Sequence, residues 1–490
     1  MNTLPWMPFI VLAPLIFSAI VALLPGRLLP WLVTTTIAAI STFLAIGVWG
    51  QIDQAPLIYT FGNWPAPVGI EYRVDAANGL VAIVVSGIAL CALLWGRATV
   101  DQEIPERQGV FYGLFLLTLA GLLGITLTGD AFNVFVFLEI SSLSTYALIA
   151  FGQDRRGLLA AFRYLIMGTI GATFVLIGIG FLYMMTGTLN MADLADRLPQ
   201  VADSNSIRAG FAFIVVGLSL KMALLPLHLW LPNAYAFAPN LVSVFLAGTA
   251  TKVALYVLLR FIFTVFGFEW TFQVLPMAPL LMALAVAGML VGSWVAMFEP
   301  DLKRLLAYSS VAQIGYLVLG VSLLSTLGLT ATFVHLFNHA LIKATLFMAL
   351  GSVIYRVGSA RIEAFYGVGR DMPWTMSAFA LAGLSLIGVP GSAGFISKWY
   401  LILASLEAGH PVLIALVLVT SLMAVYYIWR VIEAAWFKTR PADASPVTEA
   451  PLSLLIVLYL MVFLNIYFGL DTRFSLAAAK QAALAFGGAY

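Results

Sequence analysis

The stretch GLSLKMALLPLHLWLPNAYAFAPNLVSVFLAGTATKVALY, residues 217–256, is long enough for two membrane crossings of roughly 20 residues each. It nevertheless places Lys221 and Lys252 in apolar sequence, and Pro226 and Pro232 interrupt the first crossing. A charged side chain at mid-membrane costs roughly 3 kcal/mol or more, and a broken helix at that depth survives only inside protein or beside water. The stretch therefore indicates an ion path rather than a membrane anchor.

The composition of the 490-residue chain excludes a soluble globular protein. Hydrophobic residues make up 62% and charged residues only 9%, with a mean hydropathy of +1.02, whereas soluble proteins carry about 25% charged residues. We therefore expect an all-α polytopic membrane protein embedded in a lipid bilayer. The single cysteine, Cys91, excludes an intrachain disulfide and a cysteine-ligated cluster, and the lack of a basic tract argues against a nucleic-acid partner.

Apolar runs of about 20 residues predict fourteen membrane helices. Their approximate spans are 4–24, 31–50, 76–96, 109–128, 131–151, 158–185, 209–231, 240–265, 273–297, 302–324, 328–355, 374–401, 411–437 and 451–470. The connecting loops carry thirteen Lys and Arg residues on one side and six on the other, so the first side is predicted to be cytoplasmic. Both termini then face the outer, periplasmic side of a bacterial inner membrane.

An internal repeat is visible in helices four to thirteen. The motif GLSL at 217–220 recurs at 383–386, and ATFVLIGIGFLY at 172–183 aligns with ATLFMALGSVIY at 344–355, an offset of 172. A five-helix unit has an odd number of crossings, so the second copy is inverted, and inverted repeats with broken helices are typical of ion-coupled transporters. The predicted units are the three N-terminal helices (1–108), the two repeats (109–265 and 273–437), and the last helix with its tail (438–490).

Few ionisable residues lie inside the apolar spans. Glu139 is the only carboxylate well inside one, and Asp130 lies roughly 13 Å away at the rim of the same predicted helix. A lone buried carboxylate needs a nearby cation to stay ionised, and Lys221 is the candidate. Because buried ion pairs stabilise poorly compared with packed apolar residues, we favour a functional pair over a static link between helices. Lys252, in mid-crossing, is predicted to continue a proton relay rather than to snorkel to the interface.

Three titratable residues share one face of the eleventh predicted helix. His335, His339 and Lys343 are spaced i, i+4, i+8, and histidine can pass protons in either direction near neutral pH. We interpret the group as part of a proton relay. The alternatives are core histidines satisfied by their neighbours, or a metal pair, for which no carboxylate or cysteine lies nearby in sequence.

A second broken helix carries the last lysine of the series. Lys398 follows GVPGSAGFIS, where Pro390, Gly391 and Gly394 interrupt the twelfth crossing. The parallel with the first broken helix favours a functional residue over a helix-end lysine that faces water. The predicted relay runs through the middle of the protein, parallel to the membrane, and consists of Glu139, Lys221, Lys252, His335, His339, Lys343 and Lys398.

Asp130 and two further basic residues are candidates for supporting roles. His228 lies between the two prolines of the first broken helix. Arg163 lies about seven residues inside the cytoplasmic end of the sixth crossing. Since arginine scarcely releases its proton, a proton-carrying role for Arg163 is not expected.

At these residues the chain resembles a known family. The segments KMALLPLHLWLPNAYAFAP, GTATKVALY, GDAFNVFVFLEISSLSTYALIA, HLFNHALIKATLF and GVPGSAGFISKW are similar to antiporter-like subunits of Mrp-type multisubunit Na+/H+ antiporters and of respiratory complex I. The resemblance covers about residues 75–437, and the wording GDAFNVFVFLEI and TATKVALY is most similar to the Mrp-type D subunit. Ala247 stands where the complex I relatives usually carry a histidine. The resemblance implies a fourteen-helix core with helices seven and twelve broken.

The resemblance also implies roles for individual residues. Glu139 matches the family's fifth-helix glutamate, and Lys221 matches its seventh-helix lysine. Lys252 matches the bridging lysine of helix eight, and Lys398 the terminal lysine of helix twelve. Arg163 stands where many relatives have a lysine, and the wording SKWYL is also seen in hydrogenase-linked relatives.

Two functions follow from this resemblance. The first is proton translocation within a monovalent cation (Na+)/H+ antiporter, together with other membrane subunits. The second is proton pumping in the membrane arm of a complex I-like or membrane-bound hydrogenase complex, whose electron chemistry lies on other chains. In either case we expect a transporter subunit rather than an enzyme, with no cofactor or metal of its own.

Overall fold

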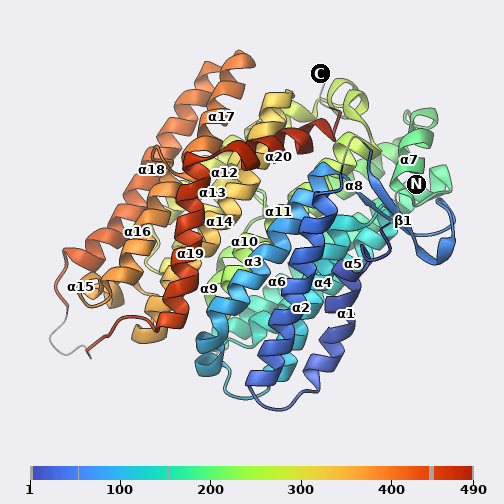
Figure 1. Cartoon of the computed structure of the whole chain (residues 1–490). Helices are drawn as coiled ribbons and strands as arrows, with labels where there is room; N and C mark the ends of the chain where they lie inside the picture. Colours follow the sequence, from blue (N-terminus) through green and yellow to red (C-terminus); the bar gives the residue numbers. More distant parts are fainter. Residues whose placement is uncertain (1–3, 53–54, 153, 441–445, 488–490) are drawn as a thin grey trace.

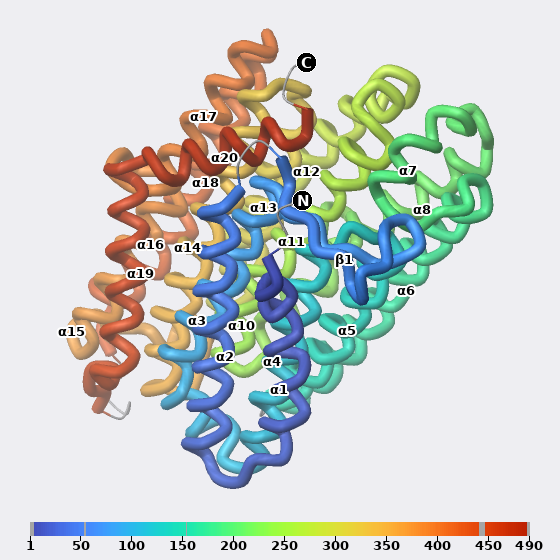
Figure 2. Tube along the Cα trace, turned by 45° about the vertical axis from the view of Figure 1, so that its right-hand side comes forward, coloured from blue at the N-terminus to red at the C-terminus, as the bar shows by residue number. Residues whose placement is uncertain are grey.

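The computed structural model describes residues 4–52, 55–152, 154–440 and 446–487, which fold into a bundle of α-helices (Figure 1; Figure 2). The crossings are α1 (Phe9–Ala22), α2 (Leu28–Trp49), α3 (Ala76–Glu103), α4 (Gln108–Leu127), α5 (Ala131–Ala150), α6 (Arg155–Thr186), α8 with α9 (Asn205–Lys221, Leu231–Phe237), α10 with α11 (Asn240–Gly248, Ala250–Leu259), α12 (Met277–Phe298), α13 (Leu302–Ser322), α14 (Thr326–Val357), α16 with α17 (Pro373–Ile387, Ala393–Glu407), α18 (Pro411–Trp436) and α19 (Leu452–Leu470). Among the described residues, eleven helices are long and apolar enough to span a membrane alone. The short α1 and the broken crossings α8 with α9 and α16 with α17 bring the number to the predicted fourteen, which is confirmed.

Shorter elements occupy the loops. Strands β1 (Leu57–Thr60) and β2 (Glu71–Val74) pair antiparallel, so a small hairpin departs from the expected all-α fold. The helix α7 (Met191–Arg197) lies in the predicted polar connection after α6. The remaining short elements are the 3-10 turns Phe61–Asn63, Leu198–Gln200 and Ile362–Phe365, the π-turns Arg260–Val265 and Trp270–Val274, and α15 (Val368–Asp371).

The expected C-terminal tail contains a further helix, α20 (Arg473–Leu484). It lies across one end of the bundle, against α14 and α3 (Figure 1). Its buried residues are Ser475, Ala478, Ala479, Ala482 and Ala483. They follow the helical i, i+3, i+4, i+7, i+8 pattern, and their small side chains let the helix lie flat on the bundle although its sequence is too polar to cross a membrane.

The two five-helix units match helix by helix. The third helices, α6 and α14, each contain 32 residues, and their ends lie 171 positions apart, at 155 and 326 and at 186 and 357. Both end on a glycine in the left-handed conformation, Gly187 with φ 71° and Gly358 with φ 76°. The fifth crossings start at 240 and 411, the same distance apart. The inverted repeat is confirmed, but its offset in these helices is one residue shorter than the sequence match suggested.

Matching aspartates begin the second helix of each unit. Asp130 and Asp301 each accept a hydrogen bond from the backbone N–H three residues later, at 2.7 and 3.0 Å. Each also forms an isolated bridge to the loop beyond the third helix, Asp130 with Asn190 and Asp301 with Arg361. Burial raises the pKa of both carboxyls. Because each unit has an odd number of crossings, the two aspartates lie at opposite ends of the bundle.

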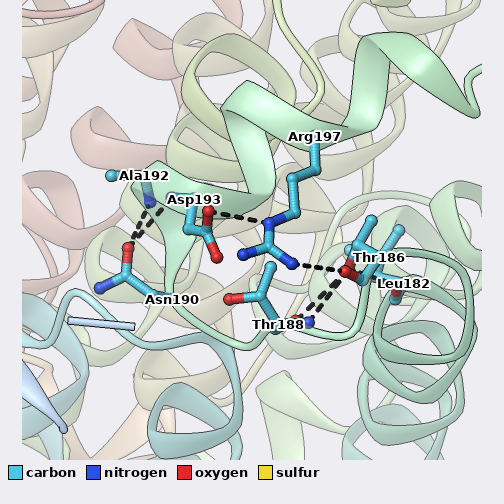
Figure 3. A network of polar contacts seen from close by, with 7 residues as sticks. All are labelled: Leu182, Thr186, Thr188, Asn190, Ala192, Asp193 and Arg197. Carbon is cyan, nitrogen blue, oxygen red and sulfur yellow. Dashed lines mark hydrogen bonds and ion pairs between the residues drawn. The ribbon is translucent and has the colours of Figure 1, made fainter. Parts of the chain in front are cut away.

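Side-chain hydrogen bonds order the loop after α6 (Figure 3). Arg197 donates to Asp193 at 2.9 Å and to the carbonyl of Thr186 at 3.0 Å. Asn190 caps α7 by accepting from two N–H groups of its first turn, at 3.0 and 3.1 Å, and its amide donates to Glu71 of β2 at 3.0 Å. The loop and the hairpin are thus joined at one end of the bundle.

Glycines bring α6 and α8 into close contact. A Cβ added to Gly178 would lie 2.6 Å from the carbonyl oxygen of Gly210, and one added to Gly217 would lie 2.5 Å from that of Gly171. Small residues at such positions let membrane helices approach closely. A Cβ on Gly180, two positions further along α6, would meet nothing within 4 Å.

We expect Gly178→Ala to destabilise the protein, whereas Gly180→Ala should not. The added methyl at Gly178 must push the two backbones apart, and overpacking typically costs about 1–3 kcal/mol. Thermal unfolding of the detergent-purified chain can be monitored by size-exclusion chromatography after heating. It should show a lower Tm for Gly178→Ala only. Equal Tm values for the two variants would contradict the close glycine contact.

Candidate functional site

The predicted relay residues lie on five helices in the middle of the bundle. Among these helices, α8 contacts α11 and α14 contacts α17, while α10, which precedes α11 in the same crossing, contacts α14. Glu139 is half-buried on α5. The basic members are at most 6% exposed, and they are Lys221, Lys252, His335, His339, Lys343 and Lys398. The structure therefore brings the predicted residues into one buried region.

The ammonium of Lys221 is held by hydroxyl groups of α5. Its Nζ donates to Ser142 Oγ at 2.6 Å and to the Tyr146 hydroxyl at 3.5 Å, so the direct pair with Glu139 that the sequence suggested is not formed. Glu139, Ser142 and Tyr146 share one face of α5 because they are three and four residues apart. Glu139 still acts electrostatically on Lys221, and within the described chain its Oε1 is buried without a hydrogen-bond partner.

The predicted break in the seventh crossing is present. α8 ends at Lys221 and α9 begins at Leu231. Pro226 lies within the gap and Pro232 in the first turn after it. The indole of Trp230 donates to the carbonyl of the residue before Lys221, at 2.9 Å. The break therefore places the ammonium at a helix end, and an aromatic side chain satisfies a carbonyl that the helix no longer uses.

The three candidates for supporting roles have different surroundings. His228 is buried in the gap, its ring 6.3 Å from that of Tyr308 on α13, and its Nδ1 has no partner among the described residues. Asp130 is the cap of α5, described above, at the end of the bundle. Arg163 is exposed on the outer face of α6. Of the three, only His228 lies beside the buried region.

A small cavity of about 40 Å³ lies between Lys221 and α11. Its walls include Ser142 on one side and Ala250 and Val253 of α11 on the other. A buried water needs roughly 10–15 Å³. The cavity therefore has room for water between Lys221 and the helix that carries Lys252.

The eighth crossing is also interrupted, which the sequence analysis did not predict. Thr249, with φ −125° and ψ −59°, separates α10 from α11. Lys252 Nζ donates to the carbonyl of Ala247, and the carbonyl of Leu246 accepts from the Tyr235 hydroxyl at 3.0 Å and from the Thr249 N–H at 3.3 Å. The break thus supplies an acceptor for a fully buried ammonium. The only sequence signal for this break is Gly248, directly before Thr249, since glycine weakens helices.

The two histidines share the face of α14 that their spacing predicted, and their rings lie parallel. The ring centroids of His335 and His339 are 5.6 Å apart with an interplanar angle of 4°, and Lys252 acts electrostatically on both rings. His335 Nδ1 lies 3.0 Å from Ser397 Oγ. His335 Nε2 and both ring nitrogens of His339 find no partner in the part of the chain that is described. Buried polar atoms are rarely left unpaired, so these three nitrogens are available to hydrogen-bond a further group.

Lys343 turns from α14 towards α13. Its Nζ donates to the carbonyl of Leu306 at 2.8 Å and to Ser309 Oγ at 2.5 Å. At the offset of 171, the residue that corresponds to Glu139 is Ser310, next to this contact. The second unit thus has a serine where the first has its carboxylate.

Lys398 is connected to the histidines through Tyr316. Its Nζ donates to the carbonyl of Ile387 at 2.7 Å and to Ser421 Oγ at 2.9 Å. The same ammonium lies 5.1 Å from the centre of the Tyr316 ring, and that ring lies 5.7 Å from His335. Polar and aromatic groups therefore lead from Lys398 to α14.

The predicted break in the twelfth crossing contains Pro390 and Gly391, and α17 begins just before Gly394. Gly391 has φ 84° and Gly388 has φ 94°, conformations that favour glycine. A Cβ on Gly394 would lie 1.7 Å from a carbonyl oxygen of α16. These residues let the chain turn tightly beside Lys398.

Two charged side chains at one end of the bundle, the half-buried Glu103 and the buried Lys303, were not predicted from the sequence. Glu103, the last residue of α3, accepts a hydrogen bond from the backbone N–H of Asn240 at 2.9 Å. Lys303 donates to the carbonyl of Ala238 at 2.9 Å and acts electrostatically on Glu103. Both side chains line a pocket of about 460 Å³. In the sequence, Lys303 lies in a short charged segment between two apolar runs, and nothing there indicates that its side chain is buried.

Comparisons with known proteins cover nearly the whole chain. Residues 128–424 match the family described as NADH:quinone oxidoreductase/Mrp antiporter, TM. The chain is 45% identical over 440 residues to NADH-quinone oxidoreductase subunit N of Desulforudis audaxviator (strain MP104C), which covers 89% of this chain and 87% of the relative. It is 28% identical over 447 residues to the D subunit of the Na(+)/H(+) antiporter of Alkalihalophilus pseudofirmus, covering 90% and 89%.

Solved structures show the same relationship. A chain of the membrane-bound sulfane sulfur reductase, an archaeal respiratory membrane complex, superposes with a TM-score of 0.90 at 32% identity, covering 98% of this chain and 97% of that one. A chain of the Mrp complex from Dietzia sp. DQ12-45-1b gives 0.89 at 25% identity, covering 98% and 96%. The protein therefore belongs to the membrane-subunit family shared by NADH:quinone oxidoreductases and Mrp antiporters.

Proposed function

We propose that this chain translocates protons along its buried line of titratable side chains, as one membrane component of a larger complex. The observation that carries the proposal is how the four lysines of this line are held. In the described chain, their hydrogen bonds go to neutral hydroxyls and carbonyls. A structural lysine in an apolar core would instead need a fixed carboxylate, since an unpaired buried charge is costly. Neutral acceptors allow each amine to gain or lose a proton.

The proposed route follows the contacts in order. Glu139 biases the charge of Lys221, and water in the small cavity joins Lys221 to the helix that carries Lys252. Lys252 acts electrostatically on His335 and His339, and a water bound to their unpartnered ring nitrogens can connect the two rings. The order of groups is Glu139, Lys221, Lys252, His339, His335 and Lys398, with Lys343 as a side branch towards α13.

Two kinds of complex fit this function. The likeness to the D subunit of an antiporter and to the Mrp complex supports exchange of protons for a monovalent cation, Na+ being our first candidate. The likeness to NADH-quinone oxidoreductase subunit N and to the sulfane sulfur reductase complex supports a redox-driven proton pump with its electron chemistry on other chains. We infer in both cases a bacterial cytoplasmic membrane, other membrane subunits as partners, and both termini on the outer side.

Purification of the tagged chain from its native membrane distinguishes the two complexes. Antiporter subunits in the purified complex, with Na+-dependent collapse of a pH gradient in everted vesicles, would support the first. Iron–sulfur subunits, with proton uptake that starts on addition of a reduced donor, would support the second. If the assembled complex shows neither activity, proton translocation itself is contradicted.

We expect Glu139→Gln to lower proton transport at least tenfold while the complex still assembles, because it removes the charge that acts on Lys221. Transport is measured as a change of pH in everted vesicles. Glu407→Gln, which changes an exposed carboxylate at the end of α17, is the matched control and should transport normally. Wild-type rates in Glu139→Gln would remove Glu139 from the route.

Lys221→Arg should be as inactive as Lys221→Ala. Arginine keeps the positive charge beside Ser142 but cannot release the proton. The same vesicle assay measures both variants, with Lys438→Arg at an exposed site as the control. An active Lys221→Arg protein would show that charge alone, rather than proton transfer, is needed at this position.

A further inference from the structure

A pocket of about 600 Å³ opens at the end of the bundle where α20 and the β-hairpin lie (Figure 1). The polar residues in its lining come from β2, the start of α3, the turn after α4, the end of the eighth crossing, and α20. They include Arg73, Asp75, Thr128, Tyr256, Arg260 and Thr264. The route proposed above uses none of them, and it does not say where protons reach water.

One helix face connects this pocket to Lys252. Lys252, Tyr256 and Arg260 are spaced i, i+4, i+8 and so share a face. The exposed fraction rises along it, from 0% for Lys252 and 2% for Tyr256 to 12% for the Arg260 side chain. The Tyr256 hydroxyl accepts a hydrogen bond from Arg260 Nε at 3.2 Å. The helix widens into a π-turn at Arg260, a local geometry that is frequent at functional sites.

Arg260 and Asp75 form an ion pair at the mouth of the pocket. Arg260 Nη2 lies 2.7 Å from Asp75 Oδ2, and the side chains are only 12% and 17% exposed. The guanidinium also lies 4.8 Å from the centre of the Phe486 ring, and Asp75 is held in place as the cap of α3. By contrast, the pair of Arg473 and Asp471 at a helix end leaves its arginine 91% exposed. Partly buried pairs stabilise little, so stability alone does not account for this one.

We propose that Tyr256 is the step at which the route exchanges protons with water in this pocket, and that the Arg260–Asp75 pair gates it. The inference rests on the proposed function and adds to it a place of access. A tyrosine hydroxyl both donates and accepts hydrogen bonds. Successive members of the face are one turn apart, with backbone positions about 6 Å apart along the helix axis, and a bridging water can connect polar groups that do not touch directly.

The step conserves atoms and charge. The Lys252 ammonium gives a proton towards the Tyr256 hydroxyl through the bridging water, and the hydroxyl proton passes to water in the pocket. Lys252 becomes a neutral amine, Tyr256 is unchanged, and one proton appears in the pocket. Arg260 does not carry the proton. Its charge repels a proton near Tyr256 unless Asp75 neutralises it, so the ion pair controls access.

Tyr256→Phe tests the step, because it keeps the ring and removes only the hydroxyl. In vesicles containing the whole complex, we expect proton transport to fall at least tenfold with assembly unchanged. Tyr112→Phe is the matched control, since that tyrosine is fully buried on α4 and its hydroxyl finds no partner among the described residues. If Lys252→Ala is inactive but Tyr256→Phe is normal, this inference is overturned while the proposed function stands. If both variants transport normally, the proposed function falls as well.

Thiol labelling tests the access route without relying on activity. In a Cys91→Ala background, Thr264→Cys places the chain's only thiol in the pocket. A membrane-impermeant maleimide should label it from one side of the membrane only, and Asp75→Asn should change the labelling rate at least threefold. Failure to label from either side, or a rate that is insensitive to Asp75→Asn, would overturn the gate.

Discussion

The structure depends on an electrostatic imbalance in a buried core of low dielectric constant. Four lysines and two histidines of the described chain share that core with a single half-buried carboxylate, Glu139. Two unit charges about 10 Å apart at an effective dielectric constant near 20 repel by roughly 1.7 kcal/mol. Protonating all the lysines at once therefore costs free energy, and a proton gained at one site lowers the proton affinity of the next. This repulsion couples sites that have no direct contact.

The broken helices make that imbalance tolerable. At Thr249 and at the break before α17, the regular helical hydrogen bonding is interrupted. Backbone carbonyls at these breaks accept hydrogen bonds from Lys252 and Lys398.

The inverted repeat places equivalent caps, Asp130 and Asp301, at opposite ends of the bundle. A pocket lies beside each of these caps, one lined by Gly129 and Arg260 and the other by Asp301 and Lys303. The same symmetry thus supplies a central polar line and a water-facing pocket at each end.

Much of this arrangement could be predicted from sequence because hydropathy and prolines are local signals. The fourteen crossings, the breaks beside Lys221 and Lys398, and the shared face of His335 and His339 all follow from spacing within one helix. Choices that depend on packing between helices could not be predicted. Ser142 takes the ammonium that the sequence assigns to Glu139, and Arg163 faces outward, because sequence does not say how each helix is rotated. The break at Thr249 lacks a proline, and α20 is too polar to register as a membrane helix, so both were missed.

The central claim is that protons cross the middle of the bundle through water that joins buried basic groups. The most direct measurement is a high-resolution cryo-EM map of the native complex, in which ordered water can be seen. The account predicts water in the cavity between Lys221 and α11 and further water bound to the nitrogens of His339. A dry, fully packed interior at both places, with no water between Lys221 and His339, would contradict it.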